Sequence, residues 1–194
     1  MKNFFCCLVT LTIFSIAQAQ SKFSTGLRAG ATLSTIEDVQ ANTRAGFYIG
    51  VLGNIKFTKF YSLQPELNFT TQGANDVFLS SHYFPETNGG TVDMPLNYLG
   101  IAVMNKFNLK SFFLQVGPAL ELLMNDSLYT YGSADLSLNV GLGYDITNNL
   151  SVEGRYKVGV ADVINDEYAL FSLFQQTNYN SVFQLGLTYR FNNN

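Results

Sequence analysis

The residue types that most often perform catalysis are scarce in this chain of 194 residues. Its one histidine, His82, directly follows Ser81, and a serine activated by a histidine base is the arrangement of nucleophilic hydrolases. A catalytic pair is defined by the mutual geometry of its side chains, which immediate neighbours in sequence rarely have. A solvated loop histidine is therefore the favoured interpretation, and no catalytic residue is predicted.

Short motifs elsewhere also have a chemical and a simpler interpretation. Gly141-Leu142-Gly143 lacks the context of a phosphate loop, and its glycines more simply make room for bulky neighbours within a strand. Asn165-Asp166-Glu167 could bind a cation weakly, but a polar loop tip explains it as well. Asn68-Phe69-Thr70 and Asn125-Asp126-Ser127 match the glycosylation pattern, which often occurs by chance. No spacing fits a zinc or calcium site, so no metal and no cofactor are expected.

Charged residues of both signs recur at alternate positions within otherwise apolar segments. They are Arg28, Lys56, Glu66, Lys106, Glu121, Asp135, Asp145, Glu153, Arg155, Lys157 and Arg190. Such a set could carry a proton or an ion, or its members could neutralise one another in an ionic core. The choice depends on the elements that position them.

The positioning element is an alternating strand, shown most clearly by residues 181–191. Phe183, Leu185, Leu187, Tyr189 and Phe191 point to one side, whereas the residues between them are small or polar. Eight segments follow this period of two, over residues 23–33, 45–57, 61–71, 96–107, 112–122, 134–146, 150–160 and 181–191. Each has about eleven residues, the length with which a tilted strand crosses the hydrocarbon core of a membrane.

The connections between these segments alternate in length. Tight turns lie around residues 58–60, 108–110 and 147–149, and longer loops are expected at 34–44, 73–95, 124–133 and 161–180. Short turns on one side and long loops on the other are typical of outer-membrane barrels, with the short side in the periplasm. The predicted fold is an all-β, transmembrane eight-stranded antiparallel up-and-down β-barrel. A soluble sandwich has no reason to keep this asymmetry.

Composition and the N-terminus agree with a location in the bacterial outer membrane. Charged residues make up 13%, about half the usual share of a soluble domain, and aromatic residues make up 14%. Met1-Lys2-Asn3, an apolar run to Ile16 and Ala17-Gln18-Ala19 predict a secretory signal peptide over residues 1–19, cleaved after Ala19. Residues 20–194 then form the barrel domain. The net charge of −3 argues against nucleic acid as a partner.

Inside a barrel of eight strands there is room only for its own side chains. The alternating charges are therefore predicted to form a structural ionic network in the interior. Pro65 and Pro118 each remove a hydrogen bond from the sheet, and bulges near the rim are expected to accommodate them. Asn105 falls on the apolar face, where it is tolerable only near the membrane interface.

Several stretches resemble the PorT-like outer-membrane β-barrel domain family. They are Gly46-Phe47 with Gly50-Val51, Leu63-Gln64-Pro65-Glu66-Leu67, Leu96-Asn97-Tyr98-Leu99, Gly117-Pro118, Gly141-Leu142-Gly143-Tyr144, Arg155-Tyr156 with Gly159, and the last strand. The chain departs from the family at Gly100 and Ala102, where relatives often carry an acidic residue and a proline. The resemblance implies a non-enzymatic outer-membrane protein, and some relatives are accessories of protein secretion.

Three functions stay open at this stage. The first is a structural or interaction barrel with long extracellular loops, the second a porin-like channel for small solutes or an accessory of secretion, and the third a barrel enzyme, which one histidine disfavours. Expected partners are outer-membrane lipid, other envelope proteins through the loops, and the barrel-assembly machinery. The apolar side chains of residues 183, 185, 187, 189 and 191 resemble the C-terminal signal that this machinery reads, although Asn192-Asn193-Asn194 follow them.

Overall fold

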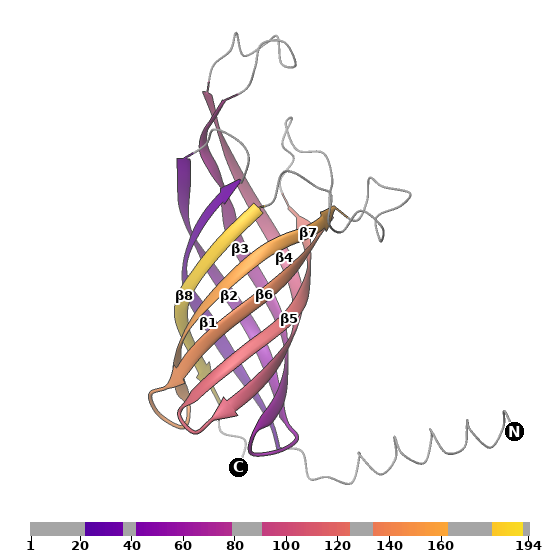
Figure 1. Ribbon diagram of the computed structural model, residues 1–194, viewed down its shortest axis with the longest axis vertical. Helices are drawn as coiled ribbons and strands as arrows, with labels where there is room; N and C mark the ends of the chain where they lie inside the picture. The colour runs from indigo at the N-terminus through magenta and orange to yellow at the C-terminus, as the bar shows by residue number, and fades with distance from the viewer. Residues whose placement is uncertain (1–21, 37–41, 79–90, 125–133, 163–179, 192–194) are drawn as a thin grey trace, which may run out of the picture.

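A computed structural model of the chain describes residues 22–36, 42–78, 91–124, 134–162 and 180–191. They form eight antiparallel strands that close into a barrel in sequence order, with the first strand paired to the last (Figure 1). The strands are β1 (Lys22–Ile36), β2 (Asn42–Lys56), β3 (Tyr61–Phe78), β4 (Thr91–Leu109), β5 (Phe112–Leu123), β6 (Ala134–Asp145), β7 (Leu150–Asp162) and β8 (Asn180–Arg190). The predicted fold class is thereby confirmed.

Alternation of side chains explains why these segments are strands and why the barrel has an apolar exterior. Along β5, Leu114 and Leu120 are exposed, whereas Gln115 and Glu121 are buried. Large apolar side chains on every strand remain about half exposed in the isolated protein, as Val140 on β6 does at 53%. Such an apolar surface is stable in contact with the hydrocarbon core of a membrane. Closure of the barrel leaves no strand edge unpaired in that core.

The extracellular half differs from prediction at β3 and β4. Within the loop expected over 73–95, residues 73–78 and 91–95 form a paired ribbon, because β3 continues to Phe78 and β4 already begins at Thr91. A register shift between Ala74 and Val77 carries the pairing onward, with Gly73 and Asp76 at positive φ. The turn-like residues that suggested a loop thus form a bulge. Figure 1 shows this ribbon rising beyond the ends of the other strands.

The expected bulges at the two prolines are wrong. Pro65 stays in register with Val103, and Pro118 with Leu138. On its other side, each proline interrupts the pairing without shifting the register. The gap opposite Pro65 lies between Leu52 and Ile55 on β2, and the gap opposite Pro118 lies between Ala102 and Asn105 on β4. A proline lacks only one donor, so one side of the strand keeps its pairing.

Short turns gather at one end of the barrel, where β1 begins and β8 ends (Figure 1). Two of these turns use the same device. Thr58 Oγ1 accepts hydrogen bonds from the N–H groups of Phe60 and Tyr61, and Thr147 Oγ1 accepts them from Asn149 and Leu150. This is the end that short turns place in the periplasm.

Aromatic rings pair on the outer surface near the same end. Phe57 stacks on Tyr61 with ring centroids 5.8 Å apart, and Phe112 meets the edge of Tyr144 at 4.9 Å. Asn105 lies in this zone, and its side chain is satisfied: it accepts from Tyr61 Oη at 2.8 Å and donates to the Val116 carbonyl at 3.3 Å. An aromatic belt of this kind marks a membrane interface. In the described part of the chain, no helix is long and apolar enough to span a membrane.

Candidate functional site: the polar interior of the barrel

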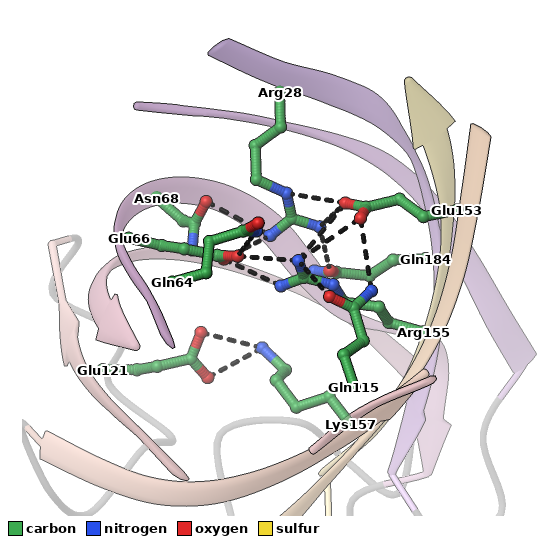
Figure 2. A network of polar contacts seen from close by, with 10 residues as sticks. All are labelled: Arg28, Gln64, Glu66, Asn68, Gln115, Glu121, Glu153, Arg155, Lys157 and Gln184. Atoms are coloured by element: carbon green, nitrogen blue, oxygen red, sulfur yellow. Dashed lines mark hydrogen bonds and ion pairs between the residues drawn. The ribbon is translucent and has the colours of Figure 1, made fainter. Parts of the chain in front are cut away.

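Four charged side chains form an alternating ring at the centre of the bore. They are Arg28 on β1, Glu66 on β3, and Glu153 and Arg155 on β7. Each arginine contacts both glutamates, with nitrogen–oxygen distances of 2.9 and 3.0 Å from Arg28 and 2.6 and 3.3 Å from Arg155 (Figure 2). All four side chains are buried, and the ring is neutral as a whole.

Amide side chains from three strands add hydrogen bonds to this central ring. Gln64 donates to Glu66 at 2.7 Å, Gln115 donates to Glu153 at 3.2 Å, and Gln184 accepts from Arg28 at 3.3 Å (Figure 2). Gln115 also accepts from Arg155 at 3.0 Å. Buried charges are stabilised only when their donors and acceptors are paired in this way. The alternation in the sequence predicts that these amides point inward. It does not predict which charged side chain each of them contacts.

Glycines shape the wall beside the ring. The Tyr48 ring lies against the guanidinium of Arg28, 4.4 Å from its Cζ. A Cβ at Gly30 would stand 2.8 Å from Tyr48 Cε1, and one at Gly186 would meet Tyr48 Oη. Gly141 likewise leaves space for Arg155, whose Cγ would lie 2.8 Å from an added Cβ. Inward glycines therefore give large inward side chains the room they need in a narrow bore.

A second ion pair lies on the extracellular side of the central ring. Lys157 Nζ contacts both carboxylate oxygens of Glu121 at 2.9 and 2.7 Å, and also donates to Gln72 at 2.8 Å. Figure 2 shows this pair apart from the ring. Three strands, β3, β5 and β7, are again joined across the interior.

The periplasmic end carries a third, more exposed group. Arg190 Nη2 lies 2.8 Å from Asp145 Oδ1, and the same oxygen accepts from Ser151 at 2.7 Å. Lys106 is 2% exposed, and its Nζ lies 3.3 Å from the centroid of the Phe113 ring. Lys56 is exposed at the mouth itself.

Among the described residues, the predicted charges lie in three groups along the bore. Ten of the eleven belong to the groups above. The eleventh, Asp135, lies near the extracellular end, in register with Glu121 on β5 and Asp162 on β7. The five apolar residues of the last strand, Phe183 to Phe191, all point outward and are exposed.

Several other predictions fall outside the described residues. These are His82 with Ser81, the Asn165-Asp166-Glu167 cluster, the Asn125 motif, Asn192–Asn194 and the signal peptide. Where residues are described, no group of three or more His, Cys, Asp or Glu side chains could hold a metal ion. The central ring and the Lys157–Glu121 pair consist of mutually neutralised charges.

A closed barrel with an apolar exterior and a filled polar interior defines a small integral outer-membrane protein. The family model described as outer membrane protein beta-barrel domain matches residues 17–165, and the chain belongs to this family. Its place is accordingly the bacterial outer membrane, in contact with membrane lipid. The narrower resemblance to PorT-like proteins stays a prediction.

One solved structure supports the fold, and two others are similar at lower scores. The attachment invasion locus protein Ail of Yersinia pestis, solved in complex with the heparin analogue sucrose octasulfate, is 14% identical, with a TM-score of 0.50 over 88% of this chain and 99% of Ail. Neisserial surface protein A is 14% identical, with a TM-score of 0.48 over 87% and 97% of the two chains. OprG from Pseudomonas aeruginosa is 11% identical, with a TM-score of 0.46 over 91% and 99%. A comparison with curated protein sequences gives no match.

Proposed function

We propose that this protein is a non-enzymatic, non-conducting outer-membrane barrel that serves as a binding platform at the cell surface. The observation that carries the proposal is the central ring of Arg28, Glu66, Glu153 and Arg155. A platform needs a rigid body with a sealed bore, whereas a channel needs a path for solutes.

The ring supports closure because it joins opposite walls. β3 and β7 stand four places apart in an eight-stranded cylinder, and Arg155 on β7 contacts Glu66 on β3 directly. A solute would have to separate buried, mutually paired charges, each of which is costly to leave without its partner. The Lys157–Glu121 pair repeats the obstruction further toward the cell exterior.

The β3–β4 ribbon supports the interaction role. It extends beyond the other strands, and side chains brace its base: Arg44 donates to Asn75 at 2.7 Å, and Asn42 donates to Asp76 at 2.8 Å. Function on rigid scaffolds concentrates in the segments that project from them. The ribbon therefore offers an ordered surface to a partner outside the cell.

Planar-bilayer recording tests the closed bore. The wild-type protein should give no single-channel current, whereas the double variant Glu66→Ala with Arg155→Ala should conduct, because both members of the cross-bore pair are gone. Lys59→Gln, in an exposed periplasmic turn, is the matched control and should be silent. Wild-type current as large as that of the double variant would refute closure and favour the solute channel.

Cross-linking in intact cells tests the platform. A photoreactive residue at Thr91 or Asp93 on the ribbon should capture a discrete envelope or extracellular partner. The same residue at Lys59 should not capture that partner, because it lies at the opposite end of the barrel. An identical product from both positions, or none from the ribbon, would contradict the role.

We also propose that the protein reaches the membrane as its sequence predicts. Removal of residues 1–19 would leave a barrel domain over 20–194, and the outward face of the last strand would engage the barrel-assembly machinery. The exposure of Phe183, Leu185, Leu187, Tyr189 and Phe191 supports such recognition, since a receptor could read all five from one side.

A further inference from the structure

A cavity of about 610 Å³ opens among the periplasmic ends of the strands. Its charged lining residues are Lys22, Lys56, Lys106, Lys110, Arg190 and Asp145. Five of the six are cationic and one is anionic, for a net charge of +4. The chain as a whole is acidic, with a net charge of −3, so this concentration of positive charge is local.

The positive charge of this cavity is largely uncompensated. Asp145 pairs with Arg190, and among the described residues none of the four lysines forms an ion pair. Lys106 is the most informative of them, because it is 2% exposed and its ammonium has only the face of the Phe113 ring as a described partner. Every other buried cation of the described interior, Arg28, Arg155 and Lys157, has a carboxylate partner.

Lys22 and Lys110 are exposed, so solvation by water explains why they need no ion pair. The same explanation does not hold for Lys106, because its side chain is buried. A buried cation without a carboxylate in direct contact is costly, and nearby cations of the same sign add to that cost. A bound anion would remove both penalties. Side chains of Ser24, Asn54 and Ser62 line the same cavity and can donate hydrogen bonds to anion oxygens.

We propose that this periplasmic cavity binds a phosphate compound that carries at least two negative charges, of the phosphate monoester or diphosphate class. Lysine ammonium groups and hydroxyl donors commonly bind phosphate oxygens together. An anion with two or more negative charges also neutralises the net charge of +4 in the cavity better than a single carboxylate does. Either a soluble periplasmic phosphate or the headgroup of phosphatidic acid, a phosphate monoester lipid, offers this chemistry. The inference does not rest on the platform role, because binding here needs neither an open nor a closed bore.

Calorimetric titration with inorganic pyrophosphate tests the site, using the barrel folded in an uncharged maltoside detergent at low salt. Saturable binding near one per barrel is expected. Lys106→Met should weaken it about tenfold, because the buried charge is lost while the side-chain volume is kept. Lys56→Gln should weaken it as well, and serves in place of Lys106→Met if that variant does not reach the folded band on a gel.

Lys59→Gln is the matched control, since Lys59 is an exposed periplasmic lysine outside the cavity. Its affinity should stay within about twofold of wild type. No saturable binding, or equal losses for Lys59→Gln and Lys106→Met, would overturn the proposal, because the attraction would then be absent or diffuse.

A second arm separates the two sources of phosphate. The titration is repeated in nanodiscs of phosphatidylcholine alone and of phosphatidylcholine with phosphatidic acid. Weaker pyrophosphate binding in the second set supports the site with lipid as its occupant. Equal binding in both supports it with a soluble phosphate. Loss of binding here would leave the conductance result untouched, so the two proposals fail separately.

Discussion

Arg155 and Glu66 face each other across the full width of the barrel and form a bidentate pair. Arg155 Nη1 lies 2.7 Å from Glu66 Oε2, and Nη2 lies 2.6 Å from Oε1. They are 89 residues apart in the sequence and stand on opposite walls, β7 and β3. The planar guanidinium matches the carboxylate in both distance and direction, which makes this the most specific contact of the interior.

Replacing Arg155 by methionine should destabilise the barrel strongly. Glu66 and Glu153 would keep only Arg28 as a cationic partner, and leaving buried charge uncompensated costs about 3–5 kcal/mol. Urea unfolding in lipid vesicles, followed by heat-modifiable gel migration, measures the loss of unfolding free energy.

The double variant Arg155→Met with Glu66→Gln is the control for that prediction. It removes one charge of each sign, so the remaining Arg28–Glu153 pair is balanced, and part of the lost stability should return. Additive losses in this double-mutant cycle would show that the two side chains are not coupled.

Gly186→Ala should destabilise the barrel through crowding. An added Cβ would stand 2.7 Å from Gly30 Cα and against Tyr48 Oη, and neither the sheet backbone nor the packed ring can withdraw easily. Overpacking of this kind costs about 1–3 kcal/mol.

Gly154→Ala is the matched control for crowding, because its Cβ would point outward and meet nothing closer than 3.9 Å. A gain of about 0.4–1 kcal/mol is expected there, since the unfolded chain loses freedom. The same urea titration compares both variants, and equal losses would refute the spatial explanation.

Val140→Arg should reveal where the hydrocarbon lies. Val140 is 53% exposed and precedes Gly141, which is in register with Arg155 of the central ring. Val140 therefore lies at the depth of that ring. An arginine facing lipid at mid-depth costs about 2–4 kcal/mol, falling to about 0–1 near an interface. Ile146→Arg, beside a periplasmic turn, should therefore be mild. Similar stability losses at both depths would place the bilayer elsewhere on the barrel.

Phe191→Ala should impair assembly in cells more than folding in vitro. Phe191 is exposed on the lipid face and contacts the edge of Tyr189, with ring centroids 5.5 Å apart. Losing one lipid-facing ring changes stability little, but it removes the last residue of the proposed assembly signal. The measurement compares the folded band from outer membranes with that from refolding in detergent. Normal assembly in cells would remove the signal from this strand face.

Much of the barrel was predictable because strand alternation is local. Leu114 and Gln115 must point to opposite sides of any sheet, whatever else the chain does. Repeated in eight segments with short and long connections, that rule predicted the closed barrel and the inward direction of Arg28, Glu66 and Arg155. The prediction failed at residues 73–78 and 91–95, which form a bulged ribbon and not a loop.

What the amino-acid sequence determined by itself is the side of the wall on which each residue lies, and with it the apolar exterior and the charged bore. Only the tertiary structure decided that Glu66 meets Arg155, that Lys157 takes Glu121, and that Lys106 has no carboxylate partner among the described residues. The reason is geometric. The direction of a side chain depends on its own strand, whereas contacts across the bore depend on how all eight strands are staggered when the cylinder closes.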